Sequence, residues 1–249
     1  MSGHSKWSQI KRQKGAADSR RGQLFTKFSR ELAVAAREGG SDPDMNPRLR
    51  LAIQRARDSN MPMDGVERAI RRGAGGTEAA NMIETNFEAY GPGGVAILLR
   101  TLSDNRNRTV SEIRTVLSKG GGSLGASGCV IWKFEAKGVI TVETRDAEEL
   151  ALSAIDMGAQ DVKVIEELVE VHTEPGDLES IRKALELKSL KVVSAELSML
   201  PNSTVMLDEK TALTTLRLLD KLEELDDVLR VYTNADFPDE ALSQYRAQS

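Results

Sequence analysis

Apolar residues recur every three to four positions between residues 22 and 73, which is the pattern of amphipathic helices. The first such run stops at Gly39-Gly40. The second begins at Asn46-Pro47, where asparagine can cap a helix and proline suits its first position. A third, short run starts near Pro62 and closes at Gly73. The apolar positions of these runs include Leu24, Phe28, Leu32, Leu49, Ile53, Val66 and Ile70. Three short helices with few aromatic residues predict a small helical bundle.

Beyond this bundle the spacing changes to that of strands alternating with helices. Residues 73–80, GAGGTEAA, indicate a linker, and the β-branched and apolar run at 95–102 predicts a buried strand after a glycine-rich turn. Thr109 with Glu112 forms a capping box and predicts a helix that starts there. The apolar run at 129–134 predicts the next strand.

The following segment, 137–204, has the order strand, helix, strand, strand, helix, strand, which is the ferredoxin-like order. A short strand at 205–207, a helix at 211–225 and a strand at 228–233 then return the chain to the preceding domain. The sequence therefore predicts an α+β protein with an N-terminal helical bundle, an α/β middle domain and an inserted ferredoxin-like domain. The predicted boundaries are 1–76 for the basic helical domain, 77–136 plus 205–240 for the middle domain, and 137–204 for the acidic ferredoxin-like domain.

Charge is distributed unevenly along these parts. Residues 1–72 carry 16 basic and 8 acidic side chains, whereas residues 139–249 carry 11 basic and 24 acidic ones, in a chain whose net charge is −4. Within residues 2–30 eight Lys or Arg face a single acid, Asp18. A solvated helix face normally mixes both signs, so a cluster this one-sided repels itself unless an anion is present. The cluster predicts binding to a polyanion through its phosphates, with the acidic part held away from it.

Composition excludes several other classes of protein. Cys129 is the single cysteine, so neither a disulfide within the chain nor a thiolate zinc site can form. With only His4 and His172, a metal site built from histidines is not expected either, and we predict structural roles for both. No apolar run is long enough to cross a bilayer and no secretory signal opens the chain, which favours a cytoplasmic protein.

No arrangement of residues predicts catalysis. GGGSLG at 120–125 matches a dinucleotide-binding fingerprint in its letters, but a helix precedes it and a strand follows, which is the reverse of the required order. Adjacent carboxylates diverge on a helix or strand, so we assign the acidic pairs to solvated faces. These pairs are Glu166-Glu167, Glu223-Glu224 and Asp226-Asp227. We therefore expect no enzyme, no cofactor and no metal, and a nuclease is the least favoured alternative.

The stretch SDNRNRT at 103–109 is a second candidate anion site. Its arginines lie where a strand passes into a helix, and guanidinium groups beside free helix N–H groups suit a phosphate. The alternative is a polar turn whose arginines pair with neighbouring acids, which the acidic C-terminal part could supply.

Together these patterns give a set of candidate nucleic-acid-binding residues. They are Lys6, Trp7, Lys11, Arg12, Lys14, Arg20, Arg21, Lys27, Arg30, Arg106 and Arg108. Because aromatic residues are scarce around the cluster, contacts to phosphates and grooves are expected in preference to stacking on several bases. We expect a monomer that binds duplex DNA or ribosomal RNA and has no membrane or small-molecule partner.

Several motifs resemble those of the YebC/PmpR family. They are GHSKW at 3–7, IKRQKGAAD at 10–18, RRGQLFTK at 20–27, DPDMNPRLR at 42–50, NMP at 60–62, YGPGG at 90–94, SDNRNRT at 103–109 and GGSLG at 121–125. The resemblance covers essentially the whole chain, and the first motif together with DNRNRT is highly specific. Gln23 and Cys129 depart from the lysine and serine usual in the family, which removes one charge from the proposed surface and changes one packing contact.

The resemblance implies the same three domains and no catalytic residue. It also implies one of two functions, since members are described as DNA-binding transcriptional regulators and others, including mitochondrial translational activators, act on ribosomes at difficult stretches such as consecutive prolines. Both targets present phosphate to arginine, so the two hypotheses stay open. We take the DNA-binding regulator as the first and the ribosome-associated factor as its alternative.

Overall fold

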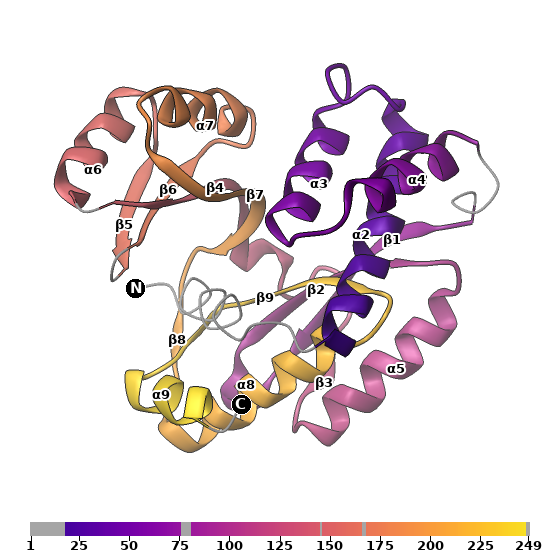
Figure 1. The fold of residues 1–249 in the computed structure, drawn as a ribbon. Coiled ribbons are helices and arrows are strands. Elements are labelled where there is room, and N and C mark those ends of the chain that lie inside the picture. Colours follow the sequence, from indigo (N-terminus) through magenta and orange to yellow (C-terminus); the bar gives the residue numbers. More distant parts are fainter. Residues whose placement is uncertain (1–17, 76–80, 145, 166–167, 248–249) are drawn as a thin grey trace. The chain divides into compact units, whose positions relative to one another are not determined.

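The computed structural model describes residues 18–75, 81–144, 146–165 and 168–247, without the side chains of residues 18–20. The helices and strands are drawn in Figure 1, and the chain divides by its internal contacts into two compact units. The first unit comprises the described residues within 1–34, 76–135 and 200–249, and the second comprises those within 35–75 and 136–199. The two units are each formed from separate stretches of sequence, and the three predicted domain boundaries stay a prediction.

The three helices predicted at the N-terminal side are present. They are α2 (Asp18–Gly39), α3 (Pro47–Asp58) and α4 (Met63–Ala74). Asn46 caps α3 by accepting a hydrogen bond from the Leu49 backbone N–H at 3.1 Å. Its amide also donates to the carbonyl oxygens of Ala35 and Gly40, both at 2.8 Å. A side chain at Gly39 would collide with Asn46, so the Gly39 and Asn46 pair fixes the turn between the two helices.

The first unit is built on an antiparallel sheet in the order β3-β1-β2-β9. These strands are β1 (Ile83–Tyr90), β2 (Ala96–Ser103), β3 (Ser123–Leu124) and β9 (Val228–Thr233). Alternate residues of a strand point to opposite faces, and Ile97 and Leu99 pack in a core with helices α5 (Arg106–Lys119), α8 (Glu209–Glu223) and α9 (Asp239–Ala247). Leu102 and Leu229 pack instead against Ala33 and Val34 of α2.

Shorter elements complete this unit. They are the 3-10 turns η1 (Pro92–Gly94) and η2 (Ile131–Lys133) and the parallel two-stranded pair β8 (Val205–Met206) and β10 (Ala235–Asp236).

The second unit contains the predicted ferredoxin-like fold. Its elements follow the order β4 (Phe134–Glu143), α6 (Ala147–Asp156), β5 (Asp161–Ile165), β6 (Leu168–Thr173), α7 (Leu178–Leu187) and β7 (Lys191–Pro201). The strands lie in the order β5-β6-β4-β7, and residues of both helices pack with the sheet in one core. The predicted α+β class and the predicted ferredoxin-like order are both confirmed.

Two local predictions were wrong. Residues 129–134 do not form a strand, because the backbone N–H groups of Val130 and Ile131 donate to the Glu88 carboxylate and the chain makes the turn η2 there. Thr109 does not cap α5, since the helix already begins at Arg106 and the side chain of Asn105 caps it. The sequence patterns also gave no indication of β1 or α9.

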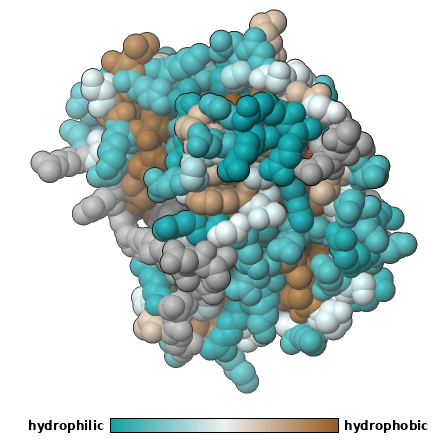
Figure 2. Space-filling view, turned by 45° about the vertical axis from the view of Figure 1, so that its right-hand side comes forward, coloured by the Kyte–Doolittle hydropathy of each residue, from teal (hydrophilic) through white to brown (hydrophobic). Residues whose placement is uncertain are grey.

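Hydrophilic residues cover most of the face shown in Figure 2, and apolar residues reach that surface only in separate places. Within the described part of the chain, no helix is both long and apolar enough to span a bilayer.

Candidate nucleic-acid interface

Much of the predicted basic cluster precedes the described residues. Lys6, Trp7, Lys11, Arg12 and Lys14 lie outside them, and Arg20 is placed only as a residue of α2. Arg21 is exposed in the first turns of the same helix. The structure therefore does not test the candidate residues before Arg21, whose binding role stays a prediction.

Lys27 and Arg30, further along α2, make contacts within the first unit. The Lys27 ammonium donates to the backbone carbonyl of Glu223, the last residue of α8, where the negative end of the helix dipole favours a cation. Arg30 donates to the Asp226 carbonyl at 3.2 Å and to an Asp227 carboxylate oxygen at 3.4 Å. Lys27 thus holds α2 against the end of α8, and Arg30 holds it against the turn between α8 and β9, so an anion would have to compete with these contacts.

Asp227 is the centre of a buried polar network at the start of β9. Its side chain is 3% exposed, and it accepts hydrogen bonds from the hydroxyls of Ser103 at 2.9 Å and Thr109 at 2.8 Å. The Arg108 guanidinium donates to it at 2.9 Å. Burial opposes the charged form, but the bonds from Arg108, Thr109 and Ser103 outweigh it and lower the pKa of Asp227. We call these four residues the Asp227 network.

The assignment of Asp227 to a solvated face was therefore wrong. Its neighbour Asp226 is exposed, in agreement with the expectation that adjacent side chains diverge. One member of the acidic pair points outward and the other inward, where the serine, threonine and arginine of SDNRNRT meet it.

Arg108 pairs with acids, as the alternative interpretation of SDNRNRT proposed. It donates to Asp227 and also to Asp104 at 2.9 Å, and hydrogen bonds from its guanidinium to these carboxylates raise its pKa. Its charge near the start of α5 is thereby compensated within the chain, and an external anion is not needed to explain it.

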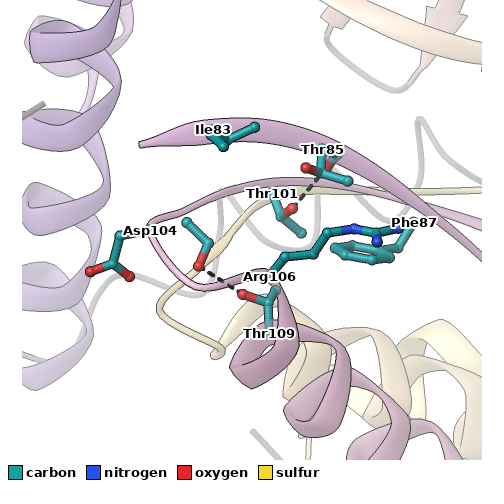
Figure 3. A pocket seen from close by; sticks show the side chains of 8 residues that line it. Ile83, Thr85, Phe87, Thr101, Asp104, Arg106 and Thr109 are labelled. Carbon is teal, nitrogen blue, oxygen red and sulfur yellow. Dashed lines mark hydrogen bonds between the residues drawn. The ribbon is translucent and has the colours of Figure 1, made fainter. Parts of the chain in front are cut away.

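Arg106 has different surroundings. Its guanidinium carbon lies 5.8 Å from the centroid of the Phe87 ring, a cation–π contact, while its side chain is exposed (Figure 3). Among the residues that the structure describes, no acid pairs with it. Arg106 is thus held in a defined direction at the first residue of α5, with its charge available to an anion.

A small pocket of about 50 Å³ lies beside Arg106 (Figure 3). It is lined by residues of β1, of β2 and of SDNRNRT, which are Ile83, Thr85, Phe87, Thr101, Ser103, Asp104, Arg106 and Thr109. The volume has room for about three or four water molecules and is too small to enclose a nucleotide base. The pocket is therefore compatible with a contact to a phosphate or sugar at its rim, and not with an enclosed substrate.

In the described ranges no group of three or more His, Cys, Asp or Glu side chains could hold a metal ion. His172 is buried in β6, with its ring nitrogens 3.5 Å from Glu170 and 3.7 Å from Asp161, in the other unit.

Comparison with known proteins finds the same family along nearly the whole chain. The family model described as the TACO1/YebC protein N-terminal domain matches residues 5–76. The model described as the TACO1/YebC second and third domain matches residues 82–235.

Similar proteins support this match. A probable transcriptional regulatory protein of Dehalococcoides mccartyi is 58% identical over 251 aligned positions, covering all of both chains. A protein of the same description from Halothermothrix orenii is 51% identical and covers 98% of each chain. The crystal structure of a conserved hypothetical protein from Aquifex aeolicus superposes with a TM-score of 0.82 at 46% identity, over 89% of this chain and 92% of that one.

Proposed function

Because the chain belongs to the TACO1/YebC family, we propose that it is a nucleic-acid-binding regulatory protein acting on duplex DNA in the cytoplasm. The observation that carries the proposal is the charge of residues 2–30, where eight basic residues accompany one acid. Neutralising phosphates with Lys and Arg releases counterions, which is the main driving force of binding to nucleic acid. The names of the relatives, probable transcriptional regulatory proteins, support regulation of transcription as the outcome.

Arg106 supplies a second contact in this proposal, and no catalytic step is part of it. The side chain is exposed, has no acid partner among the described residues and lies at the first turn of α5, where the Asn105 cap accepts only the Arg108 N–H. A phosphate at this position would meet both the guanidinium and the positive end of the helix dipole.

A competition experiment tests the proposed target. Labelled promoter fragments and random duplexes of equal length are titrated with the protein, and intact ribosomes are then added at an equal concentration of nucleotide. We expect some promoter fragments to bind more tightly than random duplex and to remain bound when ribosomes are added. Ribosomes that remove the protein from every duplex would overturn the DNA target and favour the ribosome-associated alternative.

The two arginines of SDNRNRT should respond differently to substitution. Arg106→Ala should lower the free energy of unfolding by no more than about 0.5–1 kcal/mol, the size of an exposed cation–π contact. The slope of log affinity against log salt should shrink by about one unit, because one phosphate contact is lost. Arg108→Ala should lower the free energy of unfolding, because it leaves the buried Asp227 carboxylate without its closest cation. Denaturant titration and fluorescence anisotropy measure the two quantities.

Arg114→Ala is the matched control, since it removes an exposed arginine from the same helix α5. It should change neither quantity. If Arg106→Ala binds and unfolds like this control, the proposed contact at Arg106 is refuted, and the proposed role of the basic cluster is not.

A further inference from the structure

An exposed tryptophan lies at the end of the loop that follows β3. Trp132 belongs to the turn η2 and is 66% exposed, whereas Val130 and Phe134 on either side are buried. Large aromatic side chains are normally buried for the most part, because water contact with their rings is unfavourable. Tryptophan is enriched among the residues that carry binding energy at interfaces, so an exposed one on a loop is a candidate contact for a partner molecule.

A buried carboxylate fixes the conformation of the loop that carries Trp132. Glu88 of β1 is 5% exposed and accepts backbone N–H groups from Gly128 at 2.6 Å, Val130 at 2.6 Å and Ile131 at 2.8 Å. Burial opposes its ionisation, but these three hydrogen bonds outweigh that effect and lower the pKa of Glu88. The loop is therefore preorganised by the fold and does not need a ligand to set its conformation.

The N–H group of the indole is also hydrogen-bonded within the protein. Its Nε1–H donates to the carbonyl of Cys129 at 3.1 Å, and the hydroxyl of Tyr90 donates to the same carbonyl at 3.1 Å. Asn202 donates to the Trp132 carbonyl at 3.3 Å from its side chain and to the Lys133 carbonyl at 2.8 Å from its backbone. With its N–H satisfied, the exposed indole offers a ligand only its aromatic surface.

A cation lies directly at that surface. The Lys133 ammonium is over the ring, 4.4 Å from its centroid. Trp132 is 66% exposed, and a second planar group would have to stack on the face of the ring away from Lys133. A flat aromatic ligand that carries a negative charge close to its ring would satisfy both side chains, and a nucleotide has this chemistry. Base-to-aromatic stacking is tolerant of sequence, because every base has a flat face.

We propose that Trp132 stacks on one unpaired base of the bound nucleic acid, with Lys133 facing a neighbouring phosphate. This inference rests on the proposed function for binding of nucleic acid through its phosphates. It departs from a fully paired duplex, because the bound molecule must carry at least one base outside the duplex. Bases within a duplex are already stacked on each other and their faces are closed to a side chain. The scarcity of aromatics near the basic cluster limits the number of stacked bases, and Trp132 provides for one.

The experiment compares three labelled probes of about 12 nucleotides, bound at one salt concentration: a single strand, the same strand with abasic sites, and a duplex. We expect Trp132→Ala to weaken binding of the base-containing strand about tenfold. Affinity for the abasic strand and the duplex should stay the same, because their phosphate contacts do not involve the ring. Trp132→Phe, which retains an aromatic ring, should recover most of the affinity.

Met206→Ala is the matched control, since Met206 is 71% exposed in the same unit. It should bind all three probes like the parent, and circular dichroism establishes that each variant is folded. Unchanged affinity of Trp132→Ala for the single strand would overturn the stacking proposal and would favour a protein as the partner of this surface. An equal loss on the abasic strand would overturn it as well.

The parent protein separates the two proposals. If it binds every probe with steep salt dependence while Trp132→Ala matches it, the proposed function stands and the stacking alone fails. If the parent binds none of the probes, both are refuted.

Discussion

Asp227→Asn should lower the free energy of unfolding of the first unit by about 3 kcal/mol. The asparagine keeps the size of the side chain but removes the charge that Arg108 and Arg30 approach. Its amide also brings two donors to a position where the hydroxyls of Ser103 and Thr109 already donate. The loss exceeds what the ion pair itself contributes, because the buried hydroxyls of Ser103 and Thr109 lose their charged acceptor, whereas Arg108, 45% exposed, can turn to water. Urea titration followed by fluorescence measures the change.

Asp226→Asn is the matched control, because it removes the same charge one residue earlier, from an exposed side chain. It should leave the free energy of unfolding nearly unchanged. A loss as large as that of Asp227→Asn would show that net charge, and not the buried network, is responsible.

The pH dependence follows from the lowered pKa of Asp227. A carboxylate whose pKa is lower in the folded protein stabilises the fold above its unfolded pKa, near the ordinary value of 3.8, and loses that contribution as pH falls through the folded pKa. The difference between the parent and Asp227→Asn should therefore be constant from about pH 8 to 5 and shrink below about pH 4. A difference that shrinks between pH 8 and 5 would contradict the assignment.

The fold was predictable where local signals agreed with tertiary packing. The Asn46-Pro47 pair marks the start of α3 through cap chemistry that needs no distant residue, and the ferredoxin-like order follows from the spacing of its strands and helices. The strand predicted at residues 129–134 is absent because Glu88, about 40 positions earlier, accepts the N–H groups that a neighbouring strand would need. This distant contact overrides the strand-like composition of the segment.

The positive charge of the candidate site was predictable from the sequence, but the groups that its arginines contact were not. SDNRNRT indicated both an anion contact and internal pairing, and the structure assigns Arg108 to pairing while leaving Arg106 exposed on Phe87. Sequence spacing could not separate them, because the acid that decides it, Asp227, is more than 100 positions away. The exposure of Trp132 could not be predicted either, because it lies in an apolar run, which predicts burial. Only the geometry of the loop shows that the side chain is exposed.

Affinity for duplex DNA should fall about 500-fold between roughly 50 and 200 mM salt, if the basic cluster of residues 2–30 neutralises about five phosphates. Each neutralised phosphate contributes about 0.9 to the slope of log affinity against log salt, which gives a slope near −4.5. Lys11→Ala, Lys14→Ala and Arg21→Ala combined should remove about three contacts and bring the slope to about −1.8. Anisotropy titrations at four or five salt concentrations measure the slope for the parent and the variant.

A control with the same change in charge separates local contacts from the overall field of the protein. Lys163, Lys183 and Lys191 lie in the acidic ferredoxin-like segment, and their combined substitution by alanine also removes three positive charges. This variant should bind more weakly only through long-range repulsion, which salt screens within about 10 Å, and it should keep a slope near −4.5. If both triple variants lower the slope equally, net charge alone determines binding and the basic cluster is not the interface. A parent slope near zero would be more serious, because phosphate contacts cannot then be the source of the affinity.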